Sequence, residues 1–399
     1  SSSLADITIS SVSGAISVVG AITGLNYVEV SSTTGSITLS DAVTTSGTVT
    51  SSTTNGSFGD ILIGTGTAGN VLLSGNISTT GLGDITLDND GTGTLTINGN
   101  VSTAAVNQTG FDNGDIYIGV DAITSQTGGS SVTINGTVET KGTTAGDIYI
   151  GGAGGSTVAV NKVVTAGATG SVIFFTGGLT DVITIASGAN ISAGNDVVDG
   201  STGAAVGVIN LGANIIALND SGFTLGVNGI DLDSSINLTA AVSMKASGTT
   251  SPIDLASVNG NQNLTLEATG AITLSNVGQA IALNTITVTN STGVSAGPLT
   301  AANVVLTDTT GLVAFAGTTV ITNSLTTAAK AYDVTFAGTT VLSGTPVFLN
   351  DGLVDFAGIT SLTSGATITG TATSTVNLAG TIVSGGAFNI GALPLTTTI

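Results

Sequence analysis

The chain has 399 residues, of which 41% are hydrophobic, 7% are charged and 59 are glycine, and its formal net charge is −20. It contains no Cys, His, Trp or Arg. These absences exclude a thiol nucleophile, a histidine base, a zinc site of the usual nitrogen and sulfur type, and the cationic surface that nucleic-acid binding requires.

The hydrophobic residues are mostly Val, Ile, Leu and Ala, and they are accompanied by many Thr and Ser residues. β-Branched residues favour strands, whereas the good helix formers Glu, Lys, Gln and Met are scarce. Gly, Ser, Thr or Asn interrupts every apolar run before it reaches the roughly 18 residues of a membrane-spanning helix. The sequence therefore predicts an almost entirely β protein without a transmembrane helix.

The first half of the chain carries four copies of Gly-Asp-Ile, with their aspartates at Asp60, Asp84, Asp115 and Asp147. Each copy opens a run that alternates apolar and polar residues, and the distance from one copy to the next increases along the chain. The extra residues fall in polar stretches outside these runs, as expected for loops on a repeating scaffold. We therefore predict that residues 1–200 form one half of a repeat structure.

A different octet recurs in the second half, as VAFAGTTV, VTFAGTTV and VDFAGITS. Its phenylalanines recur at nearly equal intervals, and the alternation of Val with Phe predicts that they stack in the interior. We place the glycines that follow them at a corner of the backbone. These predictions concern Phe315, Phe336, Phe356, Gly317, Gly338 and Gly358. Residues 261–399 are the predicted second half, and residues 201–260, where the repeat is weakest, are the predicted irregular junction.

A unit of roughly 20 to 24 residues is too small to bury a core alone, but stacked units can bury one together. We therefore predict a parallel β-solenoid of roughly 17 to 19 short coils in two stacked halves. A set of immunoglobulin-like sandwiches is the alternative, although it does not explain a repeat of this length.

The Gly-Asp-Ile aspartates have two interpretations. Carboxylates aligned on successive coils would repel one another, and calcium bound between them would remove that repulsion. Alternatively, each side chain accepts backbone N–H groups at the turn before a strand, which is the interpretation we favour. Weak matches to calcium loops in LDNDGTG and DNGD add further candidate metal ligands. The candidate calcium ligands are Asp88, Asp90, Asp112 and Asp115.

We do not expect an enzyme. Paired carboxylates such as Asp231 and Asp233 could serve as the acid and base of a glycosidase. However, the aromatic platforms and cationic residues that hold a sugar acid are scarce in a chain with four Tyr, no Trp and no Arg. Calcium is therefore the only cofactor that the sequence suggests.

Two longer segments carry a resemblance to a known family. NLTLEATGAITLSNVGQAIALNTITVTN from Asn263 and SLTTAAKAYDVTFAGTTVLSGTPVFLNDGLVDF from Ser324 resemble the repeats of large bacterial surface proteins of the filamentous haemagglutinin type. The resemblance implies a right-handed parallel β-helix that serves as the shaft of an exported adhesin. The Asn-Pro-Asn motif of that family's secretion domain does not occur in this sequence.

Together, these observations predict a non-catalytic extracellular or cell-surface protein, the shaft or subunit of a filament, sheath or adhesin, of bacterial origin. Because the last coil of a solenoid has unpaired strand edges, we expect copies of the chain to associate with one another. The alternative is a binding module in which the loops AAVNQTGFDNG and DAITSQTGGSS recognise a receptor or surface glycan.

Overall fold

The computed structural model describes residues 6–24, 26–46, 59–64, 66, 69–89, 93–104, 114–120, 131–142, 145–152, 156–176, 181–199, 208–217, 229–369, 374–391 and 393–397. The regular secondary structure in these residues consists of β-strands alone, and the strands pair in parallel. This arrangement confirms the predicted β-solenoid. None of them belongs to a helix long and apolar enough to cross a membrane. The chain divides into two compact units, residues 1–227 (unit 1) and 228–399 (unit 2).

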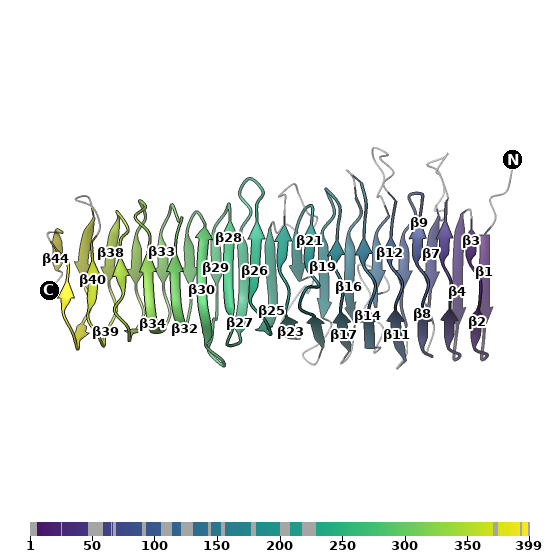
Figure 1. The fold of residues 1–399 in the computed structure, drawn as a ribbon, viewed down its shortest axis with the longest axis horizontal. Helices are drawn as coiled ribbons and strands as arrows, with labels where there is room; N and C mark the ends of the chain where they lie inside the picture. Colours follow the sequence, from purple (N-terminus) through teal and green to yellow (C-terminus); the bar gives the residue numbers. More distant parts are fainter. Residues whose placement is uncertain are drawn as a thin grey trace. The chain divides into compact units, whose positions relative to one another are not determined.

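In unit 1 each turn supplies three short strands, and equivalent strands of successive turns pair into three parallel columns (Figure 1). The first column contains β1 (Asp6–Ser11), β4 (Tyr27–Ser32), β7 (Asp60–Ile63), β10 (Ile85–Leu87), β13 (Ile116–Ile118), β16 (Ile148–Gly152), β19 (Val172–Thr176) and β22 (Val197–Asp199). The second contains β2 (Ile16–Val18), β5 (Ile37–Leu39), β8 (Val71–Leu73), β11 (Thr94–Ile97), β14 (Ser131–Ile134), β17 (Thr157–Val160), β20 (Val182–Ile185) and β23 (Val208–Leu211). The third contains β3 (Ile22–Gly24), β6 (Val43–Thr45), β9 (Ile77–Thr79), β12 (Val101–Ser102), β15 (Val138–Glu139), β18 (Val164–Thr165), β21 (Ile191–Ala193) and β24 (Ile215–Ala217).

The core of unit 1 consists of ladders of like residues. Each strand alternates buried and less buried positions, because successive side chains of a strand point to opposite faces. The parallel register then places apolar residues of successive turns on top of one another. One such ladder, fully buried, contains Val28, Ile61, Ile85, Ile116, Ile148 and Val172.

Unit 2 is built in the same way, although several of its strands are longer and continue past a corner. Its first column contains β25 (Ile230–Leu238), β27 (Ile253–Asn259), β29 (Ile272–Leu274), β31 (Val294–Ala296), β33 (Val313–Phe315), β35 (Val334–Phe336), β38 (Leu353–Phe356), β41 (Thr375–Leu378) and β44 (Leu395–Thr397). The other strands are β26 (Val242–Ala246), β28 (Asn263–Ala268), β30 (Leu283–Asn290), β32 (Leu299–Leu306), β34 (Thr319–Thr327), β36 (Thr340–Leu342), β37 (Val347–Phe348), β39 (Thr360–Leu362), β40 (Ala366–Ile368), β42 (Ile382–Ser384) and β43 (Phe388–Asn389). The long β34 pairs with both β36 and β37 of the next turn.

The predicted phenylalanine stack is confirmed in unit 2. The ring of Phe336 lies 4.9 Å from that of Phe315 and 5.4 Å from that of Phe356, with both pairs nearly parallel. Phe348 packs edge-on against Phe336 and Phe356. All four side chains are buried. Offset and edge-on contacts of this kind are the favoured geometries of aromatic pairs.

The corner position of the following glycines is also confirmed. A Cβ atom on Gly338 would lie 2.2 Å from the carbonyl oxygen of Gly317, and one on Gly358 would lie 2.3 Å from that of Gly338. Unit 1 has a similar column, in which a Cβ on Gly99 would lie 1.9 Å from the carbonyl oxygen of Gly75. Successive turns therefore approach one another so closely at these corners that only glycine fits.

The length of a turn differs between the units. In unit 2, the intervals between Val313, Val334 and Val354 agree with the predicted period of roughly 21 residues. In unit 1 the turn from Ile7 to its partner Val28 is of similar length, whereas the next turn, from Val28 to Ile61, is about half as long again. The polar insertions that the sequence places outside the strands therefore lengthen some turns of unit 1 and leave the strand pairing in place.

Candidate functional site

The aspartates of the Gly-Asp-Ile repeats form one hydrogen-bonded column in unit 1. The backbone N–H of Asp84 donates to Oδ1 of Asp60 over 3.1 Å, and the N–H of Asp115 donates to Oδ1 of Asp84 over 2.8 Å. The N–H of Asp147 donates to Oδ1 of Asp115 over 2.8 Å. Ser171 of the next turn donates its N–H to Oδ1 of Asp147 over 2.7 Å.

This column confirms the hydrogen-bonding interpretation of the aspartates, with one difference. Each carboxylate accepts its hydrogen bond from a backbone N–H group in the following turn of the solenoid. The donor is not an N–H group of the short loop that precedes the aspartate's own strand. Hydrogen bonds to a charged acceptor are about twice as strong as bonds between neutral groups. The repeated aspartate therefore joins each turn of this region to the next.

Two tyrosines extend the column on the outer side of the same strands. Tyr117 donates its hydroxyl to Oδ2 of Asp115 over 3.0 Å, and Tyr149 donates its hydroxyl to Oδ2 of Asp147 over 3.2 Å. Their rings are stacked, with centroids 4.7 Å apart and planes 7° from parallel. Phe175 follows Tyr149 in the stack at 6.0 Å. Both oxygens of Asp115 and of Asp147 therefore accept a hydrogen bond from the protein.

The tyrosines lie in a protected and strongly acidic environment. Tyr149 is only 5% exposed, although the alternation of its strand directs it away from the core. Burial raises the pKa of Tyr117 well above its ordinary value, and the carboxylates of Asp115 and Asp84 raise it further. The Tyr117 phenol is therefore protonated throughout the physiological pH range and acts as a hydrogen-bond donor.

Tyr27 follows the same rule at another position of unit 1. Its hydroxyl donates to Oε2 of Glu29 over 3.1 Å. Burial raises its pKa to about 12, with further contributions from Glu29. In both places an outward tyrosine donates to the acidic residue two positions away on the same strand face, at Asp115 for Tyr117 and at Glu29 for Tyr27.

Of the four calcium candidates, Asp88 and Asp115 are among the described residues, whereas Asp90 and Asp112 lie outside them. Asp88 is buried directly after β10, where its N–H donates to the carbonyl oxygen of Ile63 over 3.0 Å. Asp115 lies beside Asp84 at the other end of β10. At about 3.3 Å per residue, Asp88 and Asp115 are separated by roughly 13 Å along the strand direction alone, which is too far for them to share one ion.

In the described part of the chain, no three His, Cys, Asp or Glu residues are grouped so that they could hold a metal ion. Calcium binding at Asp88, Asp90, Asp112 or Asp115 stays a prediction, although Asp88 and Asp115 would not bind the same ion. The loops AAVNQTGFDNG and DAITSQTGGSS, proposed as receptor-binding loops, fall mainly on residues 105–113 and 121–130, which lie outside the described residues.

The candidate acid and base pair lies on the outer face of unit 2. Asp231 and Asp233 are two residues apart on β25, and Asp231 faces Asp254 of β27 in register. Burial raises the pKa of Asp254 above its ordinary value, and the carboxylate of Asp233 raises it further. This is a small group of carboxylates of like charge on adjacent strands.

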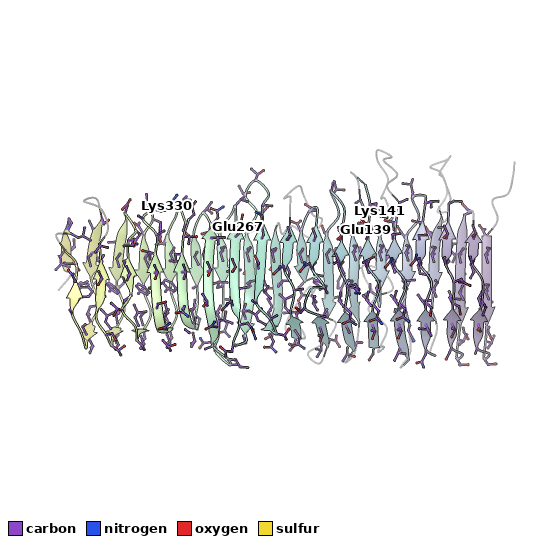
Figure 2. All side chains as sticks on the ribbon, in the orientation of Figure 1. Glu139, Lys141, Glu267 and Lys330 are labelled. Carbon is purple, nitrogen blue, oxygen red and sulfur yellow. The ribbon has the colours of Figure 1, made fainter. Side chains whose placement is uncertain are left out.

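Three of the four lysines pair with acidic residues. Lys141 lies 3.3 Å from Glu139, and Lys330 lies 3.3 Å from Asp308. Lys245 lies 2.7 Å from Glu267 of the neighbouring strand, its partner in register. Figure 2 labels Glu139 and Lys141 on unit 1 and Glu267 and Lys330 on unit 2. These side chains are about half exposed, so each pair contributes at most about 1 kcal/mol.

Sequence reasoning missed two polar or aromatic ladders. One is the tyrosine stack, although the repeated GDIYIG already placed a tyrosine two residues after an aspartate in consecutive copies. The other is an amide ladder, in which Asn135 donates to Oδ1 of Asn98 and Asn161 donates to Oδ1 of Asn135, both over 2.9 Å. Its signal was an Asn directly after three consecutive second strand runs, at Asn98, Asn135 and Asn161.

The fold and these ladders define a repeat protein of the parallel β-solenoid class. No protein-family model, no curated protein and no solved structure matches the chain.

Proposed function

We propose that the chain is a non-catalytic structural protein, the shaft or subunit of an extracellular filament, sheath or adhesin at a bacterial surface, and that copies of it associate. The main observation in support is that its repeated residues bind the equivalent residues of the next turn. The Gly-Asp-Ile aspartates of unit 1 accept hydrogen bonds from the following turn, and the repeated phenylalanines of unit 2 stack on one another.

Such a construction suits a load-bearing element. In a solenoid each turn contacts only its neighbours, so stability is roughly the sum of local contributions from each turn and each interface. Here each interface in the described ladders combines backbone pairing, buried apolar ladders and side-chain hydrogen bonds. Extending the structure by further turns adds stability in proportion to length, which is the property that a shaft needs.

The surface charge supports the same proposal. The net charge of −20 and the pairing of three of the four lysines with acidic residues leave the protein strongly acidic. Like charge keeps copies apart at low ionic strength. Divalent cations would screen this charge and bridge carboxylates of different copies.

The resemblance of the repeats to filamentous haemagglutinin-type surface proteins motivates the extracellular and bacterial assignment. The segments from Asn263 and from Ser324 that carry it lie in unit 2, between β28 and β38. The Val, Ile, Leu and Phe residues that these segments bury lie in strands that pair with those of the neighbouring turns.

Electron microscopy of the purified chain, with and without millimolar calcium, tests the proposal. We expect elongated particles in both conditions, and fibres in calcium if cations bridge the carboxylates. Compact, round particles in both conditions would contradict the structural role.

A second assay separates the shaft from a receptor-binding module. Adhesion to glycan-coated surfaces is compared between the natural chain and a variant in which residues 105–113 and 121–130 are replaced by Gly-Ser sequences of equal length. A structural shaft keeps its particle shape and shows no adhesion to lose. Strong adhesion that the variant loses would favour the glycan-binding alternative.

A further inference from the structure

We propose that Tyr117 and Tyr149 form a site of oxidative cross-linking, at which a one-electron oxidant of the peroxidase class, using hydrogen peroxide, joins the two phenol rings as dityrosine. This inference is independent of the proposed structural role. It rests on the arrangement of two tyrosines and two aspartates on adjacent turns of unit 1.

The geometry brings the two rings together. Tyr117 and Tyr149 are partners in register on the paired strands β13 and β16. Adjacent strands lie about 4.8 Å apart, and the ring centroids are 4.7 Å apart with planes 7° from parallel. The ring carbons next to the phenol oxygens therefore reach bonding distance by rotation of the side chains alone, while the backbone pairing stays in place.

Each tyrosine also has its own proton acceptor. The hydroxyl of Tyr117 donates to Asp115, and that of Tyr149 donates to Asp147. A phenol that loses an electron becomes strongly acidic, so its proton moves along the existing hydrogen bond to the carboxylate. The paired carboxylates thus favour oxidation at these two rings, because each accepts the proton that its phenol releases.

The reaction balances as follows. Each phenol loses one electron and one proton, and the two electrons and two protons reduce one hydrogen peroxide to two water molecules. The two tyrosyl radicals then couple through the carbons adjacent to their oxygens. The hydrogens on those carbons move to the oxygens, which restores two phenols joined by a carbon–carbon bond. The product is lighter than the starting protein by two hydrogen atoms.

The chain contains four tyrosines, all of them among the described residues. Within that described part, Tyr117 and Tyr149 are the only two tyrosines whose rings are in contact. Tyr27 pairs with Glu29, and Tyr332 lies in unit 2, where its hydroxyl accepts a hydrogen bond from the N–H of Ala328. A single intramolecular product is therefore expected.

The lysine positions allow a direct test. Trypsin cleaves after Lys141, which lies between the two tyrosines, and after Lys162. The full chain is treated at low concentration with a haem peroxidase and hydrogen peroxide, then denatured, digested and analysed by mass spectrometry and dityrosine fluorescence. We expect peptides 1–141 and 142–162 to become covalently joined, with the loss of two hydrogen atoms.

Matched variants locate the bond. Tyr149→Phe is expected to keep the fold, because it removes only the hydroxyl and leaves the ring in contact with Tyr117 and Phe175. This variant should lose at least nine tenths of the joined peptide. Tyr27→Phe and Tyr332→Phe should leave the yield unchanged.

Three outcomes would overturn the proposal. The first is tyrosine oxidation without the joined peptide. The second is an equal yield of the joined peptide from Tyr149→Phe. The third is dityrosine found only in covalent dimers, which would place the reacting rings on different copies of the chain.

Discussion

The two units of this chain build the same kind of turn under different constraints. In unit 2, from Ile253 onward, paired residues of the first strand column follow at a nearly constant interval of about 20 residues. In unit 1 the corresponding interval varies, and the longest is about half as long again as the shortest. Each unit also has its own aromatic ladder. The ladder of unit 2 lies in the interior, with Phe336 at its centre, whereas that of unit 1 lies on the outer side of the strands, at Tyr117 and Tyr149.

The two units keep the register between turns by different means. A constant turn length lets large side chains such as Phe336 repeat inside, because each turn presents the same cross-section to the next. Where insertions vary the turn, the aspartates fix the start of each strand by binding the N–H group of the following turn. A one-residue slip would exchange the two faces of a strand, so such fixed points are valuable where turns vary.

The largest effect is expected from the interior stack of unit 2. Phe336→Ala removes a ring that contacts Phe315, Phe356 and Phe348, and should lower the free energy of unfolding of unit 2 by about 3 to 5 kcal/mol. Denaturant unfolding followed by circular dichroism measures the loss. Phe336→Leu is the matched control, since Leu378 already occupies the equivalent position, and should cost under about 1.5 kcal/mol. Equal effects of the two changes would contradict the predicted cost of the cavity.

The glycine corners test what the two units share. Gly338→Ala in unit 2 and Gly99→Ala in unit 1 each place a Cβ against a backbone oxygen of the preceding turn, and each should cost about 2 to 3 kcal/mol. Gly293→Ala serves as the milder comparison and should cost less, because its Cβ would lie 3.1 Å from the nearest atom, the carbonyl oxygen of Leu312. Thermal unfolding of the three variants makes the comparison. A large loss at Gly338 with none at Gly99 would restrict the close-packed corner to unit 2.

The aspartate column of unit 1 is tested at Asp115. Asp115→Ala removes the acceptor of the Asp147 N–H and of the Tyr117 hydroxyl, and should cost about 2 kcal/mol. Asp115→Asn keeps an oxygen for the N–H group and should cost less. Hydrogen exchange at the Asp147 amide measures the loss of its hydrogen bond in each variant, and denaturant unfolding measures the loss of stability.

The Asp115→Ala and Asp115→Asn variants also allow a spectroscopic measurement of the Tyr117 pKa. Burial raises the pKa of Tyr117 and the carboxylate of Asp115 raises it further, so removal of this carboxylate should lower the pKa while the contribution of burial remains. Ultraviolet titration of the tyrosines at alkaline pH follows the change. An unchanged Tyr117 pKa in Asp115→Ala would contradict the electrostatic coupling of the pair.

The smallest effect is expected at Asp254 in unit 2. Its pKa is raised in the folded protein by burial and by Asp233, so the folded state holds the proton more tightly than the unfolded state. Folding stability therefore decreases as the pH rises through the interval between the ordinary value of 3.8 and the raised pKa. Because the side chain is only partly buried, solvent screening keeps the change below about 1 kcal/mol.

Asp254→Asn removes this penalty. Unfolding of the natural chain and the variant at about pH 3 and pH 7 should show an advantage of the variant that grows with pH. An advantage that is independent of pH would assign the effect to packing instead of charge.

Local alternation was sufficient to predict the buried stack of unit 2, because Val and Phe two residues apart share one face of a strand. The glycine corner after Phe336 could be predicted from the length of the repeat, since a short repeat leaves few residues in which the backbone can change direction. The column of aspartates could be predicted as a hydrogen-bonding group, but its acceptor role toward the next turn depends on the register between turns.

Other features depend on parts of the structure that the sequence pattern does not encode. Tyr117 and Tyr149 lie on the outward positions of their strands, so alternation alone predicts exposed side chains, whereas Tyr149 is almost fully buried. The separation of Asp88 from Asp115 depends on which end of β10 each residue adjoins, which a match to a calcium-loop pattern ignores. The pairing of the long β34 with both β36 and β37 likewise depends on how the next turn bends.

The match between successive turns of unit 2 also has a genetic consequence. Val334 pairs with Val313 on one side and with Val354 on the other, and the phenylalanine and glycine of each octet keep the same place. Removing the segment from Val334 to Leu353 would place Phe356 above Phe315 and Gly358 above Gly317. Unequal recombination between the repeats of the gene can therefore shorten or lengthen the protein by whole turns while the strands of the first column keep equivalent partners.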